Sequence, residues 1–340
     1  MITVELLQAN EGDCIFLNLD NIHILIDAGK NARCHTQIIS QELEKQGWNG
    51  ILDLVILTHI DNDHIGGAQA FIEDERLQIR EIWYNGYQHL PQDIFHFGRG
   101  QKVSYGEKRS VIGANNLSAL IKQKKILWNW RFNECAVIRN IEKPIQIEKN
   151  LKIWILNPGI EELNSLKKVW NKTEYEINRC DSEMIDGELD ELTMLSIPIT
   201  STKTNDSSIV IIIEYNDKKM LFTGDASQRV WMLPLEKWCS IYNPSKHFEL
   251  IKVPHHGSEK STNADFYKKF TAEYFMISTD GIRGREQHPS KVVLAHIIKN
   301  NPNCNICFNY AHNGYQYCRK LLQDGKKYYF HVMVNQKVII

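Results

Sequence analysis

The apolar run ILDLVILT, residues 51–58, favours folds that bury a strand on both faces. A strand with one face in water alternates apolar and polar side chains, whereas a strand covered on both faces is apolar nearly throughout. We therefore expect residues 51–58 to form a strand inside a layered α/β structure, with the segment EIWYNG, residues 81–86, as its neighbour.

Short apolar segments separated by turns continue this pattern along the chain. The N-terminal part has the expected strands ITVELL, CIFLNL and HILIDAG, a hairpin turn at Asn21 and a helix from about His35 to Gln46. In the second half, the expected strands SSIVIIIEY, KMLFTGDA, FELIKVP and YFMIS alternate with the expected helices QRVWMLPLEKW, NADFYKKF and PSKVVLAHIIKN. A strand pair, YYFHVMVN and QKVII, is expected to end the chain, and the charged and polar stretch 160–204 is interpreted as an insertion.

Composition excludes several classes of protein. Hydrophobic residues make up 43% of the chain and charged residues 24%, which is the balance of a globular protein rather than a disordered one. No apolar stretch approaches the roughly 20 residues of a membrane helix, and the N-terminus lacks the basic and apolar regions of a signal peptide. The net charge of −1 argues against a non-specific nucleic-acid coat, and the eight cysteines lack the spacing of a disulfide framework. The sequence predicts a cytoplasmic protein with reduced thiols and no membrane partner.

The stretch THIDNDHIGG, residues 58–67, follows the expected buried strand directly. In open α/β sheets, the loops at the carboxyl ends of the strands form the usual ligand crevice. The side chains in this stretch that can bind metal are those of His59, Asp61, Asp63 and His64. A tight loop can turn their nitrogen and oxygen atoms toward one point, and Gly66 and Gly67 allow the backbone to come close. Such a set can coordinate a divalent cation.

Two other interpretations fit the same stretch. One is an ordinary helix N-terminus, with Asp61 or Asn62 as the cap and His64 in the first turn. The other is a calcium-binding loop, because Asp61, Asp63 and Gly66 fall at positions one, three and six of the EF-hand pattern. Positions five and twelve of that pattern hold isoleucine here, which offers no oxygen ligand.

Three further polar clusters follow apolar strands and favour the metal interpretation. LFTGDAS contains Asp225, IKVPHHGS contains His255 and His256, and GREQHPS contains His288. An isolated aspartate after a strand is usually a cap or turn residue. Four such clusters at strand ends indicate a shared site.

At these motifs the sequence resembles the metallo-β-lactamase superfamily, whose signature H-x-H-x-D-H follows a buried strand. LIDAG with Asp27, THIDNDHIGG, and LFTGD with Asp225 look like its first, second and fourth motifs, in the same order and with fitting spacing. The resemblance covers most of the chain. It implies an α/β fold, a metallo-β-lactamase-like four-layer αββα sandwich, as a single domain over residues 1–340 with the insertion at about 160–204.

The second histidine of the signature is replaced by Asp61, which gives H-x-D-x-D-H. Together with NEGDC, NDSSIV, KVPHHGS and the later HP, this departure resembles the hydrolase domain of ComEC-type competence proteins, which process DNA during uptake. Those proteins carry membrane helices, and this sequence shows none. The domain is therefore expected to stand alone here. The third motif, usually a histidine, has no clear counterpart, and Asn205, Asp206 or Ser207 would occupy its place.

The resemblance also implies roles for the individual side chains. The implied metal ligands are His59, Asp61, Asp63, His64, Asp225 and His255, and the implied catalytic residues are Asp63, His256 and His288. His59 and Asp61 would bind one cation, Asp63 and His64 the other, and Asp225 would bridge them. The resemblance leaves open which of His255 and His256 is the ligand and which donates a proton, and whether His288 is a ligand or an acid. A carboxylate at Asp61 favours Mn²⁺ over Zn²⁺ without excluding either.

Two divalent cations roughly 3.5 to 4 Å apart can share a water, lower its pKa and stabilise in-line attack at phosphorus. The leading hypothesis is therefore a metal-dependent phosphodiesterase or nuclease with DNA as its substrate. A second hypothesis is hydrolysis of a small carbonyl substrate such as a lactone, thioester or β-lactam, because one fold hosts many chemistries. A third is an effector subunit that binds a regulatory protein partner.

Overall fold

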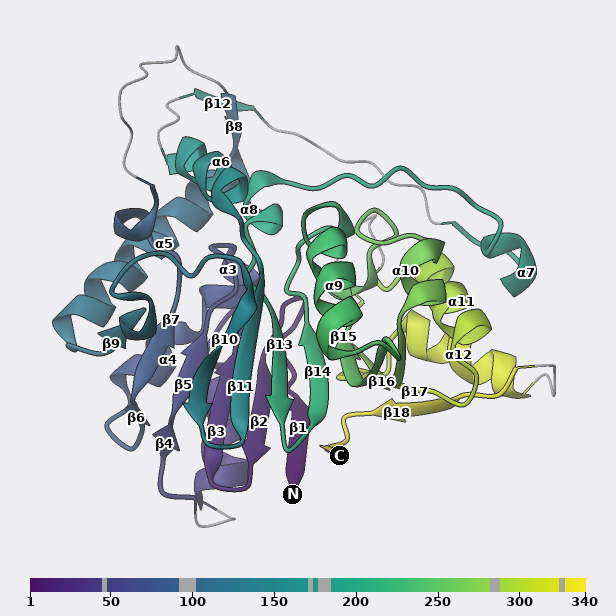
Figure 1. The fold of residues 1–340 in the computed structure, drawn as a ribbon, viewed down its shortest axis with the longest axis horizontal. Coiled ribbons are helices and arrows are strands. Elements are labelled where there is room, and N and C mark those ends of the chain that lie inside the picture. The colour runs from purple at the N-terminus through teal and green to yellow at the C-terminus, as the bar shows by residue number, and fades with distance from the viewer. Residues whose placement is uncertain (45–47, 92–101, 171–173, 177–184, 282–287, 324–327) are drawn as a thin grey trace.

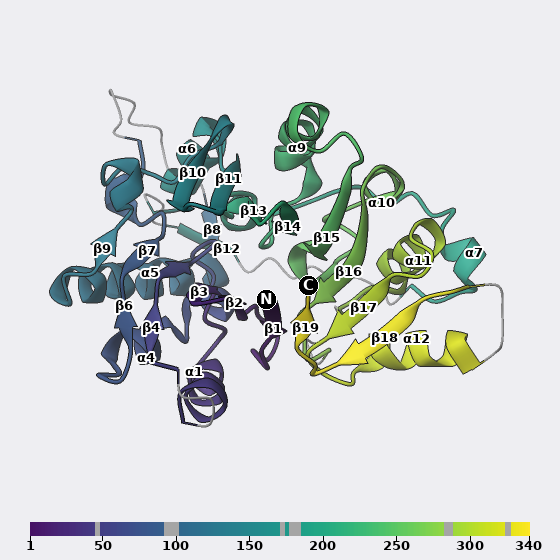
Figure 2. The ribbon, with the colours of Figure 1, turned by 60° about the horizontal axis from the view of Figure 1, so that its bottom comes forward.

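Two β-sheets lie face to face, and helices cover the outer face of each (Figure 1). The structure is a computed structural model that describes residues 1–44, 48–91, 102–170, 174–176, 185–281, 288–323 and 328–340. Figure 2 shows the same layers from another side, with β1 and β19 close to both ends of the chain.

The first sheet has seven strands in the order β19-β1-β2-β3-β5-β7-β9. They are β1 (Ile2–Leu6), β2 (Ile15–Leu19), β3 (Ile22–Ile26), β5 (Leu54–Ile56), β7 (Glu81–Trp83), β9 (Leu127–Trp128) and β19 (Val338–Ile339). β3, β5, β7 and β9 run parallel to one another, which puts the carboxyl ends of β3 and β5 side by side.

The second sheet has eight strands in the order β10-β11-β13-β14-β15-β16-β17-β18. They are β10 (Asn140–Glu148), β11 (Leu151–Asn157), β13 (Val210–Tyr215), β14 (Lys218–Phe222), β15 (His247–Lys252), β16 (Thr271–Ile277), β17 (Asn305–Phe308) and β18 (His331–Val334). The strands from β14 to β18 are parallel, so β14, β15 and β16 also end at one edge. Two small sheets pair β4 (Ile51–Leu52) with β6 (Gln78–Ile79), and β8 (Lys102–Ser104) with β12 (Glu174–Glu176).

The helices fall into two groups. Those nearer the first sheet are α1 (Arg33–Ile38), which continues as a π-helix (Ile39–Leu43), α3 (Asn62–Ile65), α4 (Ala68–Glu73), α5 (Tyr105–Gln123) and α6 (Ile160–Trp170). The others are α7 (Leu189–Leu192), α8 (Lys203–Asp206), α9 (Gln228–Tyr242), α10 (Ala264–Lys269), α11 (Lys291–Asn300) and α12 (Asn313–Gln323). Short 3₁₀ turns lie at Tyr87–His89, Trp130–Phe132 and Pro254–Gly257.

Three separate hydrophobic clusters hold these layers together. One contains residues of both sheets, such as Ile24 and Ile211, and fills the space between them. A second joins the first sheet to helices, as Leu25 and Phe71 do, and the third joins the second sheet to helices, as Ile212 and Trp231 do. Three buried interfaces require four layers, so the expected αββα sandwich is confirmed.

Strand periodicity explains how one strand serves two clusters. Successive side chains of a strand point to opposite faces of its sheet. In β5, Leu54 and Ile56 face the space between the sheets, whereas Val55 faces the helices. All three residues are almost fully buried, which is why this part of the sequence is apolar without alternation.

Two expected strand assignments were wrong. Residues 51–58 are split at Asp53 into β4 and β5, because β4 pairs with β6 while β5 joins the main sheet. The segments YYFHVMVN and QKVII both form strands, but these do not pair with each other. β18 extends the second sheet and β19 crosses to the free edge of β1 in the first.

Two helix assignments also differ. The first helix and its π-helical continuation span 33–43 instead of 35–46, and residues 45 and 46 of the expected helix lie outside the described residues. Helix α12 was not expected. His312 precedes it, and its Nδ1 accepts hydrogen bonds from the N–H groups of Gly314 and Tyr315, as an N-cap side chain does. Histidine is not a usual cap, so no start signal for this helix is visible in the sequence.

The helices in the described parts of the chain include none that is both long and apolar enough to cross a membrane.

Candidate metal centre

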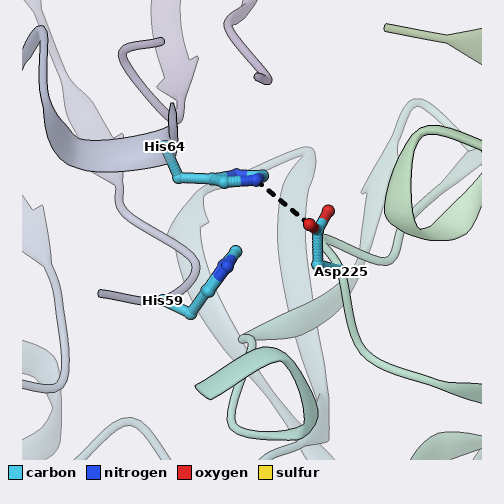
Figure 3. Close-up of side chains that lie close together, drawn as sticks. All are labelled: His59, His64 and Asp225. Carbon is cyan, nitrogen blue, oxygen red and sulfur yellow. Dashed lines mark ion pairs between the residues drawn. The ribbon is translucent and has the colours of Figure 1, made fainter. Parts of the chain in front are cut away.

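Buried histidine and aspartate side chains meet at the edge where strands of both sheets end. His59 follows β5, Asp63 and His64 lie in α3, Asp225 follows β14, and His256 follows β15. Figure 3 shows His59, His64 and Asp225 pointing toward one another, with the His64–Asp225 ion pair dashed. The convergence expected from the sequence is therefore present.

Three of the histidines are oriented in the same way. Each bonds a neighbour through Nδ1: His59 bonds Thr58 Oγ1 at 3.1 Å, His64 bonds Asp27 Oδ2 at 2.8 Å, and His256 bonds the Ser278 carbonyl oxygen at 2.8 Å. A hydrogen bond from Nδ1–H to an oxygen places the lone pair on Nε2. The Nε2 atoms of all three imidazoles are therefore left as potential metal ligands.

Two of the four groups of described residues that could hold a metal consist entirely of these side chains. His59, His64 and Asp225 make one set, and Asp63, His64 and His256 make the other, with the ligand atoms of each set within 4.8 Å of one another. Oδ2 of Asp225 lies 3.3 Å from Nε2 of both His64 and His256, and Oδ2 of Asp63 lies 3.7 Å from Nε2 of His256. The Asp225 carboxylate thus lies between the imidazoles of His64 and His256, where it could be a ligand shared by two cations.

The unsatisfied atoms of this cluster fit a cation. The Nε2 atoms of His59, His64 and His256 and Oδ1 of Asp225 are buried and have no hydrogen-bond partner. Leaving a buried polar atom unsatisfied costs about 1–3 kcal/mol, so native proteins rarely leave several together without a ligand. Imidazole nitrogen and carboxylate oxygen are the donors that Zn²⁺ and Mn²⁺ accept.

The charges of the cluster also favour a cation. Burial opposes the charged form of His64, but the carboxylates of Asp225 and Asp27 raise its pKa well above the ordinary value. The pKa of His256 is raised in the same way, against burial, by Asp225 and Asp13. Burial would raise the pKa of Asp225, yet His256 and His64 hold it well below its usual range. The field that favours imidazolium here would equally favour a divalent cation.

Asp61 lies beside the cluster rather than within either ligand set of the described residues. Its Oδ2 is 3.6 Å from Nε2 of His59. Ser110 of α5 and Thr204 of α8 donate hydroxyl hydrogen bonds to its two carboxylate oxygens, at 2.8 and 3.2 Å. Asp61 occupies the N-cap position of α3, but its side chain makes no cap hydrogen bond. The helix-start interpretation is therefore right for the backbone and wrong for the side chain.

The two adjacent histidines point to different surroundings. His256 is 1% exposed and faces the cluster, whereas the His255 side chain is 20% exposed and its Nε2 lies 3.8 Å from Asp225. His255 Nε2 is also 3.4 Å from Nδ2 of Asn205, and its Nδ1 is 3.0 Å from the Ser261 hydroxyl. Both histidines have left-handed backbone, with φ of 47° and 55°, a conformation that is uncommon for non-glycine residues.

The segment expected to replace the third motif supplies no imidazole. Asn205 approaches His255, while Asp206 turns away to accept hydrogen bonds from Ser227 and Arg229. The Ser207 hydroxyl donates to the carbonyl oxygen of Thr204. Of the three candidates for this motif, only Asn205 faces the centre.

His288 lies at the rim of the centre. It is 7% exposed, and its ring centroid is 5.5 Å from that of His255 and 6.4 Å from that of His256. The structure thus brings together all eight side chains assigned from the sequence.

Sequence reasoning missed a buried ion pair beneath the ligands. Lys252, the last residue of β15, pairs with Asp13, and both are 1% exposed. NEGDC and KVPHHGS were singled out as motifs, but the roles of these two residues were not. The signal was a lysine directly after the apolar pair Leu250 and Ile251 and directly before Val253, since lysine is almost never fully buried unless it is paired.

A comparison with protein families agrees with the fold and the cluster. Residues 8–279 match the model described as the Metallo-beta-lactamase superfamily, so the chain belongs to this superfamily of metal-dependent hydrolases. Members typically bind divalent metal ions such as zinc. A search of curated proteins found no match.

Three of the solved structures that are similar to this chain are described here by their source. The metallo-β-lactamase fold protein YhfI from Bacillus subtilis has 10% identity, with 98% of this chain and 96% of that chain covered and a TM-score of 0.44. The short form of human tRNase Z has 12% identity, with 99% of both chains covered and a TM-score of 0.44. Zn²⁺-bound PqqB from Methylobacterium extorquens has 10% identity, with 97% and 88% covered and a TM-score of 0.43. Similarity at this level does not bear on the substrate.

Proposed function

We propose that the protein is a phosphodiesterase that hydrolyses DNA with two bound divalent cations. The observation that carries the proposal is the pair of overlapping ligand sets, which share His64. Asp225 belongs to the first set, and its Oδ2 also lies 3.3 Å from Nε2 of His256 in the second. Two neighbouring cations suit in-line displacement at phosphorus, where both the attacking and the leaving oxygen need stabilisation.

We assign His59, Asp61 and Asp225 to the first cation, and Asp63, His64, His256 and Asp225 to the second. The sequence-based ligand list contains His255, whereas this assignment has His256 in its place, because His256 Nε2 is buried and unsatisfied within the cluster. Asp61 stands where the superfamily signature has a histidine, and no imidazole comes from the third-motif segment. The first site is therefore rich in oxygen, which favours Mn²⁺.

Bound divalent cations would supply an activated water and neutralise charge on the substrate phosphate. Other side chains of the protein keep the histidines of the centre in position. Asp27 and Thr58 orient the inner imidazoles, and the more exposed His255 is held between Asn205 and Ser261 at the mouth of the centre. In this proposal His255, with His288 beside it, would donate a hydrogen bond to a phosphate oxygen.

The choice of DNA over a small carbonyl substrate rests on Asp61 and on the resemblance of NEGDC, NDSSIV and KVPHHGS to ComEC-type hydrolase domains. The catalytic role of His288, a cytoplasmic location and a regulatory protein partner stay predictions.

The test is hydrolysis of DNA and of bis-nitrophenyl phosphate by the purified protein, loaded with Mn²⁺ or Zn²⁺. We expect hydrolysis of both, and its loss in Asp63→Ala but not in Asp265→Ala, which removes an exposed carboxylate from α10. A lactone, a thioester and a β-lactam are assayed in parallel. Metal-loaded protein that cleaves one of these and leaves the phosphodiesters intact would refute the proposal.

A further inference from the structure

Lys252 places a buried ammonium group next to this centre. Its ammonium group pairs with Asp13, donates to the carbonyl oxygen of Gly224 at 2.9 Å and lies 3.7 Å from Oδ1 of Asp225. These partners belong to the loops after β1 and β14, so one ammonium joins three segments at the sheet edge. A buried lysine must be paired to stay charged, and here two carboxylates serve it.

The two carboxylate oxygens of Asp225 have different neighbours, with Lys252 near Oδ1 and the histidines near Oδ2. Oδ1 is the oxygen nearer the ammonium group, at 3.7 Å. Oδ2 is the oxygen that lies 3.3 Å from His64, 3.3 Å from His256 and 3.8 Å from His255. Rotation of the carboxylate would exchange these environments, and the fixed positive charge on one side opposes that rotation.

Asp13 has the geometry of a ligand, but its carboxylate is already occupied. It belongs to two of the four groups of described residues that could hold a metal, one with Asp225 and His256 and one with Asp27 and His64. Oδ2 of Asp13 pairs with Lys252, and Oδ1 lies 3.4 Å from Nδ1 of His256. The ammonium thus satisfies the carboxylate oxygen through which Asp13 would hold a metal, and in the group with Asp225 it also lies 3.7 Å from the second carboxylate. The groups left for metal are therefore the two without Asp13.

We propose that Lys252 is a positioning residue that withholds Asp13 from the metal ions and commits Oδ2 of Asp225 to them. The inference rests on the proposed function insofar as the centre must bind divalent cations. It predicts a centre with three cations, of which two are exchangeable metals and one is a fixed ammonium. Without the ammonium, the Asp13 carboxylate would be free to enter the metal coordination.

The test replaces Lys252 by methionine, which is apolar and similar in length, and loads each protein with Co²⁺. Metal content per chain and the visible d–d absorption spectrum of bound Co²⁺ report ligand number and geometry without any activity assay. We expect Lys252→Met to change the spectrum, because Asp13 becomes a ligand. The double variant Asp13→Asn/Lys252→Met should return the spectrum toward that of the wild type. An unchanged spectrum in folded Lys252→Met would overturn the inference.

The single variant Asp13→Asn keeps the test decisive if Lys252→Met does not fold. Asparagine retains the shape of the side chain and still accepts a hydrogen bond from Lys252. If Asp13 is withheld from the metals, Asp13→Asn leaves the Co²⁺ spectrum and the metal content unchanged. A shifted spectrum or a lost metal would show that Asp13 is a ligand and that Lys252 does not exclude it. A wild-type protein that binds no divalent cation would refute the proposed function itself, which separates the two failures.

Discussion

Nδ1 of His64 lies 2.8 Å from Oδ2 of Asp27, and neither side chain is exposed to solvent. The same carboxylate accepts hydrogen bonds from the backbone N–H of Thr58 at 2.7 Å and from its hydroxyl at 2.8 Å. The Thr58 oxygen in turn bonds Nδ1 of His59. Asp27 therefore orients two imidazoles of the candidate metal centre without being placed among their ligands.

Replacing Asp27 by asparagine should weaken metal binding while preserving the fold. Asp27 has a φ of 57°, which asparagine tolerates well, so the backbone is kept. If the new amide N–H faces His64, Nδ1 must accept, and the proton moves to Nε2, where a metal would bind. We expect a loss of about 10–100-fold in metal affinity, measured by equilibrium dialysis.

The matched control is Asp53→Asn. Asp53 accepts a hydrogen bond from the backbone N–H of His23 at 2.8 Å, and it precedes β5, whereas the metal centre follows that strand. This variant should bind metal like the wild type. Equal affinities for all three proteins would show that Asp27 does not orient the ligands.

Gly12→Ala should disrupt the centre by a purely steric effect. A Cβ atom on Gly12 would lie 1.8 Å from the carbonyl oxygen of Asp63, so the backbone that carries Asp63 and His64 would have to move. Overpacking of this kind costs about 1–3 kcal/mol. We expect a lower melting temperature and reduced metal content.

Gly113→Ala in α5 is the control for this substitution. The nearest atom to a Cβ there is Cδ1 of Ile65, at 3.9 Å, and alanine is roughly 0.5–1 kcal/mol better than glycine in a helix interior. This variant should be at least as stable as the wild type and retain its metal. Thermal unfolding and elemental analysis of both variants check the prediction, and wild-type metal content in Gly12→Ala would contradict it.

His312 should make the protein less stable in mild acid. Burial lowers its pKa to about 4, below the ordinary value of 6.5. Between these values the unfolded chain binds a proton that the folded protein does not, so stability falls as the pH drops from 6.5 toward 4. A shift of this size corresponds to about 3 kcal/mol at most.

The variant His312→Asn keeps an N-cap for α12 and removes the titrating ring. Denaturant unfolding between pH 7 and pH 4 should show a smaller loss of stability for His312→Asn than for the wild type. His331→Asn, at an exposed position, should follow the wild type. Parallel curves for all three proteins would disprove the role of His312.

Local patterns in the sequence were enough to place most ligands at strand ends. The carboxyl end of an apolar strand is visible in the sequence, and so are the polar residues that follow it, as at His59 and Asp225. The expectation that parallel strands bring such residues together needs only the general geometry of α/β sheets. It held because β5, β14 and β15 all end at the same edge.

Pairing choices and side-chain directions could not be obtained in this way. The sequence of QKVII predicts a strand, but the free edge of β1 decides its partner. HHGS places two histidines after a strand, but only the left-handed turn decides that His256 faces the cluster and His255 the rim.

Periodicity and residue type were enough to predict the layered α/β class, the strand-end clusters and the side chains available for a metal. These depend on short-range periodicity and on chemistry that each residue carries with it. The packing of the two sheets, in contrast, sets which nitrogen of each histidine faces the centre, and it brings Asp27 to His64 and Lys252 to Asp13. The reason is physical: these relations join loops separated by tens to hundreds of residues, and their geometry exists only once both sheets have packed.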